Sequence, residues 1–265
     1  MNAAFDEIMR KALVASGLDT AGWDTIIESF RQRAFFSAQV AEMRLLHELR
    51  DGIAGLVSST KSPSEIRRDA RALLSSIGYD AGDDAGTIKD LTTKARLDLI
   101  IRTNAEQAKG FANHIRATNA GAILAFPAYE LIRVRGRRVP RDWDKRWRDG
   151  AEACAYDGVA RGTDRKIALK TSPIWKLISR FGNPFPPFDF NSGMGVRDIK
   201  KSVCRELGLL GEDEQPEIPE TPDFNGNLRS KVPFGEDSPE FTRLKSIFGD
   251  QVVFRNGEVR WSGEK

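Results

Sequence analysis

The residues best suited to chemistry in this sequence form a short basic stretch that also carries tryptophan. Between positions 133 and 149, eight basic residues stand against three aspartates. Guanidinium groups bind phosphate and carboxylate through paired hydrogen bonds, and indole rings stack on bases or on guanidinium planes. The stretch therefore predicts a contact surface for an acidic partner, either nucleic acid or protein. The arginines predicted to make these contacts are Arg133, Arg135, Arg137, Arg138, Arg141, Arg146 and Arg148.

Two tryptophans leave the role of this stretch open. Trp143 and Trp147 are four residues apart, so they share one face of a helix predicted over residues 141–153. The favoured interpretation places both rings in the core and the arginines on a solvated face, while the alternative exposes the rings for stacking. Arginine and tryptophan also dominate protein–protein hot spots, so composition alone does not choose the partner.

Catalytic patterns are poorly represented. The Gly-x-Ser-x-Gly and P-loop motifs are absent. Ser192 falls on a predicted turn with no histidine near it in sequence. A glycine-containing turn at residues 191–195 precedes a predicted helix and admits an anion site, but a plain turn with a helix cap is favoured. An enzymatic alternative uses a polar site of Asp189, Asn191 and His114.

Metal and cofactor sites are not indicated. The cysteines are Cys154 and Cys204, the histidines are His47 and His114, and they form no familiar zinc-binding spacing. We therefore predict no metal ligands and no cofactor. With no secretion signal in the sequence, the two cysteines are expected as buried thiols.

The composition of the 265 residues, with 40% hydrophobic and 30% charged, is typical of a soluble globular protein. No stretch approaches the roughly 18 apolar residues of a membrane span, so we expect an intracellular protein without a membrane segment. The net charge of +3 is small, but its distribution is uneven, because the basic stretch precedes an acidic, proline-rich one after Gly211.

The elements expected before the basic stretch are helical. Residues 1–57 carry apolar side chains at three- and four-residue spacing, and residues 62–65 predict a capped helix that ends at Gly78. A long helix is predicted from Thr87, at most to Asn119. It contains Arg-Thr-Asn directly after an apolar run, so at least one of these polar groups should lie near the core. If that group is the arginine, it should be held in a hydrogen-bond network, because a buried guanidinium needs paired acceptors.

After that helix, alternation predicts a strand over residues 129–135, and helical spacing predicts helices over 171–181 and 196–209. Between those two helices, the prolines of residues 183–188 predict a stiff, extended segment. Its phenylalanines serve either as a rod that docks a partner or as a lid on the core.

The end of the chain predicts a hairpin, since Asn256-Gly257 joins two short alternating arms and suits a type I′ turn. We predict an α+β fold with a helix-rich N-terminal region, a small mixed α/β core and an extended C-terminal segment with a β-hairpin. The predicted divisions are residues 1–86, the core at 87–210, an acidic linker with a short helix at 211–250, and the hairpin at 251–265.

Several motifs, taken in order over residues 25–210, resemble the phage Mu F-like minor head proteins, the head-morphogenesis family of tailed double-stranded DNA phages. They begin in the N-terminal helices, continue through an Arg-Thr-Asn helix motif and an arginine-rich element at 137–143, and end with the aromatic, proline-rich stretch. Their order and spacing carry the resemblance. The matching positions are Arg102, Thr103, Asn104, Trp143, Trp175, Pro186, Pro187, Phe188 and Asn191.

This resemblance implies a minor structural protein of a phage or prophage head. Its expected partners are the portal protein, other head proteins and double-stranded DNA, and its expected locations are the host cytoplasm during assembly and then the virion head or neck. Many family members carry histidine where this chain has Asp142 or Trp143, and Cys-Arg-Cys at 192–194. A metal site therefore does not carry over, and an assembly role without catalysis does. A stand-alone DNA-binding protein and a toxin-like enzyme are the alternatives.

Overall fold

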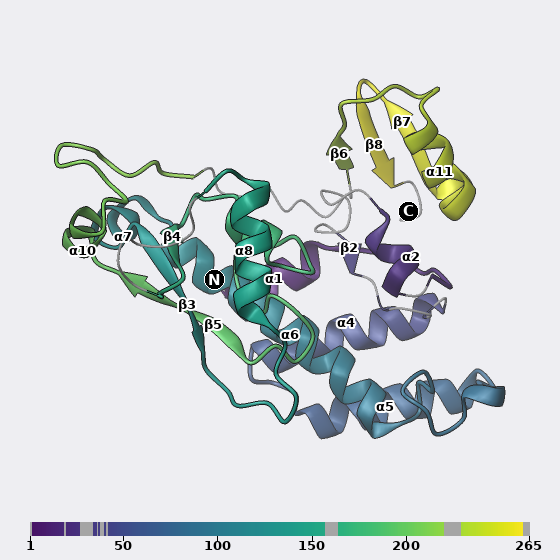
Figure 1. Cartoon of the computed structure of the whole chain (residues 1–265). Coiled ribbons are helices and arrows are strands. Elements are labelled where there is room, and N and C mark those ends of the chain that lie inside the picture. Colours follow the sequence, from purple (N-terminus) through teal and green to yellow (C-terminus); the bar gives the residue numbers. More distant parts are fainter. Residues whose placement is uncertain are drawn as a thin grey trace. The chain divides into compact units, whose positions relative to one another are not determined.

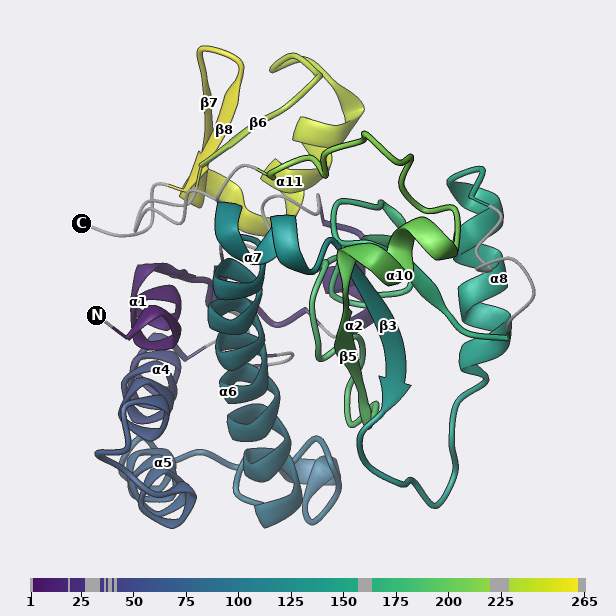
Figure 2. The same ribbon diagram turned by 90° about the vertical axis from the view of Figure 1, so that its left-hand side faces the viewer.

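The computed structural model describes most of the chain as two compact units. The first combines Met1–Ala108 with Asp223–Lys265, and the second is Lys109–Pro222. Helices and small separate sheets occur in both, so the fold is α+β, as the sequence predicts (Figures 1 and 2). The described residues are 2–18, 20–26, 34–35, 37, 40, 42–156, 164–219 and 229–261.

The first unit begins with helices and one short pair of parallel strands. The prediction of helical pieces at residues 5–16 and 25–56 is wrong at this pair, where Ala12 lies opposite Ala34 and Leu13 opposite Phe35. All four residues are buried, and this long-range pairing overrides the local helical spacing. Residues 27–33 of the predicted helix lie outside the described residues. The elements are α1 (Ala3–Arg10), β1 (Ala12–Leu13), α2 (Thr20–Asp24), β2 (Ala34–Phe35), α4 (Met43–Val57), α5 (Pro63–Ser76), η1 (Gly82–Asp84) and α6 (Lys94–Ala117), whose last turns belong to the second unit.

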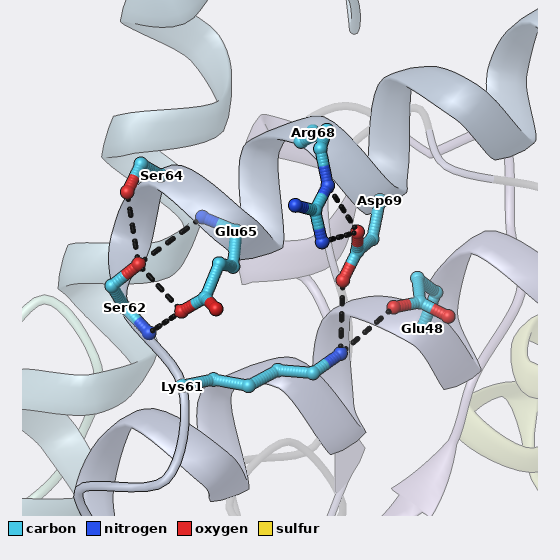
Figure 3. Close-up of polar contacts among 7 residues, drawn as sticks. All are labelled: Glu48, Lys61, Ser62, Ser64, Glu65, Arg68 and Asp69. Atoms are coloured by element: carbon cyan, nitrogen blue, oxygen red, sulfur yellow. Dashed lines mark hydrogen bonds and ion pairs between the residues drawn. The ribbon is translucent and has the colours of Figure 1, made fainter.

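The corner between α4 and α5 follows the sequence prediction. The backbone N–H of Glu65 donates to Ser62 Oγ at 3.3 Å, and the carboxylate of Glu65 accepts from the Ser62 N–H at 2.7 Å, which completes a capping box. Lys61 Nζ lies 3.4 Å from Glu48 and 3.1 Å from Asp69, and so ties the turn to both helices (Figure 3). This network is part of the structure of the helix pair.

The long helix begins later than predicted, at Lys94 instead of Thr87. The buried carboxylate of Asp90 accepts hydrogen bonds from the backbone N–H groups of Gly86 and Thr92, at 2.9 and 2.8 Å. These bonds hold the chain in turns before the helix, because an aspartate that bonds to nearby backbone competes with helical geometry.

The first unit ends with a three-stranded antiparallel sheet and a helix. Asn256 and Gly257 both have positive φ, at 52° and 74°, which confirms the hairpin and its type I′ turn. The predicted linker is wrong at residues 229–231, which form the outer strand β6 beside β8. The short helix predicted in this region is α11. The elements are β6 (Arg229–Lys231), α11 (Pro239–Phe248), η2 (Gly249–Gln251), β7 (Val252–Arg255) and β8 (Glu258–Trp261).

The second unit is built on an antiparallel sheet of order β4-β3-β5, with helices on both faces. Side chains of α8 and α9 share a core with Tyr129 and Leu131 on one face, and α10 packs with Ala128 and Ile199 on the other. The predicted strand at 129–135 is confirmed as β3, which begins one residue earlier and ends two residues earlier than predicted. The elements after α6 are α7 (Ala120–Ala125), β3 (Ala128–Arg133), α8 (Trp143–Ala153), β4 (Ile167–Leu169), α9 (Ile174–Leu177), β5 (Met194–Ile199) and α10 (Lys201–Glu206).

Two predicted helices of this unit are shorter in the structure. The helix predicted over 196–209 is wrong in its first part, since β5 pairs along the whole of β3 and α10 begins only at Lys201. An anion site at the start of that helix is therefore excluded. The helix predicted over 171–181 contracts to α9, a single turn. In the part of the chain that the structure describes, no helix combines the length and apolar character of a membrane span.

Candidate functional site

The tryptophans of the basic stretch lie in the core of the second unit. Trp143 is 5% exposed and Trp147 is 3% exposed, and the ring of Trp147 meets that of Trp175 edge to face at 5.4 Å. Trp175 is fully buried, and its indole N–H donates to the carbonyl of Leu169 at 2.9 Å. The favoured interpretation of these rings is thus confirmed, and the alternative of rings exposed to stack on bases is wrong.

The proline-rich segment closes this core. Phe188 is fully buried and stacks on Trp175 with ring centroids 6.0 Å apart, and Phe185 is 6% exposed. The predicted extended course is wrong, because the chain bends at residues 184–186. The bend turns the phenylalanine rings inward, so the segment is a lid on the core and does not present a rod for docking.

Two of the predicted contact arginines are held by a buried carboxylate. Asp189, 3% exposed, forms an ion pair with Arg141, whose Nε lies 3.2 Å from its carboxylate, and accepts a hydrogen bond from Arg146 Nη1 at 3.0 Å. The guanidinium of Arg146 also lies 4.9 Å from the centre of the Trp143 ring. These interactions join the end of the proline-rich segment to the start of α8, so both arginines have a structural role.

The remaining arginines divide by exposure. Arg137 is half-buried, and its Nε has no hydrogen-bond partner among the described residues. Arg135 and Arg148 are exposed. Arg133 and Arg138 are also exposed and form no ion pair within the described ranges.

The segment that runs from the last residue of β3 towards α8, residues 133–141, is here called the basic loop. The backbone N–H groups of Val134 and Arg135 donate to the carbonyl of Gly193 at 2.9 and 3.0 Å, which fixes the start of the loop against the residue that precedes β5. A Cβ on Gly193 would lie 2.5 Å from the carbonyl oxygen of Arg135, so only glycine fits this approach. The loop is thus a shaped surface that carries exposed arginines.

The Arg-Thr-Asn motif of α6 does not form a network around a buried arginine. Arg102 is exposed, Thr103 is buried, and Asn104 Nδ2 donates back to the carbonyl of Ile100 at 2.9 Å. The prediction that one polar group lies near the core is confirmed by Thr103. The hydrogen-bond network expected for a buried arginine does not apply, since Arg102 lies on the solvent side of the helix.

The residues proposed for an enzymatic site take separate structural partners. Asp189 holds two arginines, and Asn191 lies in the left-handed region with φ of 51°. His114 packs against Phe185, with ring centroids 5.3 Å apart. Burial, and secondly the charge of Lys170, lower the pKa of His114 to about 4. A neutral imidazole in this apolar setting has a packing role.

Sequence reasoning missed two charged clusters on the sheet. Glu130, 6% exposed, receives paired hydrogen bonds from Arg165 at 2.8 and 2.7 Å and a further one from Arg197, so the pKa of its carboxyl is lowered, chiefly by Arg165. The side chain of Lys170 is only 1% exposed and pairs with Asp198 at 2.6 Å. Burial lowers the pKa of the Lys170 ammonium group. The sequence could have indicated the role of Glu130, because a charged residue inside an otherwise apolar strand is expected to have a charged partner.

Among the described residues, no group of three or more His, Cys, Asp or Glu side chains is placed to hold a metal ion. Both cysteines are free thiols, with Cys204 buried and Cys154 half-buried. Fold and site together define an α+β protein whose second unit presents a basic surface loop. No protein-family model, curated protein or solved structure matches this chain.

Proposed function

We propose that this chain is a minor structural protein of a tailed-phage or prophage head, bound to the portal or procapsid, that assists assembly or the packaging and delivery of DNA. It acts at low copy number and without catalysis of its own. Its partners are the portal protein and other head proteins, and it passes from the host cytoplasm into the virion head or neck.

One observation carries this proposal beyond the order of the motifs. The later motif positions, far apart in sequence, meet in one packed region: Trp143, Trp175 and Phe188 belong to one core cluster. Asp189, within the last motif, pairs with Arg141 of the arginine-rich element and with Arg146, which follows that element on α8. In a domain shared with the family, the motif residues are expected to pack against one another. Chance matches to single motifs would not be expected to lie in one core.

The test is co-purification with the portal protein encoded in the same phage or prophage genome. A tagged chain is expressed with the portal protein, and separately with complete procapsids, and the bound fraction is measured after sedimentation. The proposal expects the chain with the portal or procapsid at substoichiometric amounts. A chain that remains in the soluble fraction, with portal and procapsid both present, would overturn it.

Stand-alone DNA binding is the second candidate, because Arg133 and Arg138 are exposed and free of ion pairs within the described ranges. It expects binding to bare duplex that weakens steeply with salt, since each phosphate contact releases counterions. R133E/R138E should then abolish the binding, while K176E/R205E, with the same charge change at exposed positions of α9 and α10, should retain it. Wild-type chain without affinity for duplex at low salt removes this candidate.

A further inference from the structure

The basic loop carries exposed apolar side chains among its arginines. Val139 is 83% exposed and Val134 is 56% exposed. Apolar side chains gain little from contact with a phosphate backbone, whereas they are buried favourably against apolar groups of a protein. The chemistry of the loop therefore favours a protein partner that offers both carboxylates and an apolar group.

A segment of this same chain has that complementary chemistry. Residues 211–219, here called the acidic segment, follow α10 and expose the carboxylates of Glu212, Asp213 and Glu217. They also expose Ile218, to 51%. The acidic segment thus combines negative charge with an apolar side chain, as the basic loop combines arginine with valine.

The acidic segment is also held in shape. Glu214 accepts a hydrogen bond from the Gly211 N–H at 2.8 Å, Lys201 Nζ donates to Gln215 Oε1 at 2.8 Å, and Pro216 is buried. A surface that is ordered before binding loses less conformational entropy when it binds. Both the basic loop and the acidic segment meet this condition.

The two surfaces lie at opposite ends of the second unit. In both views the basic loop is at the lower end, between β3 and α8, and the acidic segment, which follows α10, is at the upper end (Figures 1 and 2). Since both belong to the same unit, one copy of the chain cannot bring them together while that unit stays folded.

We propose that the basic loop of one copy binds the acidic segment of a second copy, so that the protein associates head to tail. Arg133 and Arg138 face the carboxylates of the partner copy, and Val139 packs against its Ile218. A contact between two different surfaces leaves one of each free, so it continues into a ring or an open chain. The proposal rests on this complementarity alone and does not depend on an assignment to phage heads.

Charge exchange tests the proposal on the full chain by sedimentation velocity over a range of concentrations at low salt. R133E/R138E and E212K/E217K should each weaken self-association by at least about tenfold, because like charges then meet. The matched controls K176E/R205E and E152K/E206K make the same charge changes at exposed positions elsewhere in the second unit and should associate like wild type.

The exchanged charges should restore the contact. A chain with all four substitutions, R133E/R138E/E212K/E217K, is expected to associate again, and the two double variants should associate when mixed. Val139→Ser should weaken association at any salt concentration, whereas Leu177→Ser, at an exposed position of α9, should not. Wild type that stays monomeric, double variants that associate like wild type, or a fourfold variant that stays monomeric would each overturn the proposal.

Discussion

At the residue scale, buried carboxylates decide which arginines are available to a partner. Asp189 binds Arg141 and Arg146, and Glu130 binds Arg165 and Arg197. Removing such a carboxylate would leave its guanidinium partners without their acceptor, which is costly where the pair is buried. The arginine count of the sequence therefore overestimates the contact surface, because composition does not record which charges are already paired.

His114 gives a pH dependence at the same scale. Its pKa is about 4 in the folded chain and 6.5 as the ordinary value, so folding disfavours the protonated form. The contribution of the neutral His114 side chain to the stability of the folded chain is complete above about pH 6.5, and it is lost as the pH falls towards 4. A shift of this size corresponds to about 3 kcal/mol, at roughly 1.36 kcal/mol per pKa unit. Lys170, pointed at the same core, increases the cost of a second positive charge.

The check is the free energy of unfolding by urea at pH 7 and pH 4.5. His114→Leu should reduce the difference between the two pH values by about 2 to 3 kcal/mol relative to wild type. An equal pH response in wild type and His114→Leu would contradict the assignment of this loss to His114.

At the element scale, α6 and the proline-rich segment touch through backbone. A Cβ added at Gly110 would lie 1.8 Å from the carbonyl oxygen of Pro186, far inside contact distance, and that atom belongs to the main chain. The phenylalanine rings of the segment lie against the same helix, with Phe111 and Phe185 at 5.9 Å. Glycine is therefore required where the helix crosses the segment.

Gly110→Ala should destabilise the second unit by about 2 kcal/mol or more, because α6 and the segment must separate to admit the methyl group. Gly121→Ala is the matched control: it also lies in a helix, and its Cβ would meet nothing closer than Asn119 Oδ1 at 3.6 Å. The control should be neutral or more stable, by up to about 1 kcal/mol. Urea unfolding of both variants tests the contact, and equal stability of the two would disprove it.

Local signals predicted some elements and missed others for identifiable reasons. The capping box of Ser62 and the turn at Asn256 depend only on adjacent residues, so both were predictable. The strands β1 and β5 depend on pairing with distant residues, and short apolar spacing does not distinguish such strands from helix. The composition of the sequence predicts a basic contact surface here. Which of its arginines are paired and which are exposed could be learned only from the structure, which places Asp189 beside two of them.

At the scale of the whole molecule, both ends of the chain share one core in the first unit. Ala12 and Val14 lie in one buried cluster with Val252, Val259 and residues of α11. The sequence placed these segments in separate divisions, because nothing local records that a strand near the N-terminus packs against a hairpin at the C-terminus. The second unit has its own cores, so the hairpin should stabilise the first unit selectively.

Val259→Ala tests this selectivity, since the side chain is fully buried and its truncation leaves a cavity in the shared cluster. Such a change costs about 1 to 3 kcal/mol, so local opening becomes more frequent. Hydrogen exchange should therefore accelerate in peptides that cover residues 12–14 as well as the hairpin, and remain unchanged in β3. Val253→Ala is the control, because Val253 is half-buried in the same hairpin and lies outside the cluster. If exchange at residues 12–14 responds no more to Val259→Ala than to Val253→Ala, the two ends of the chain do not stabilise each other through this core.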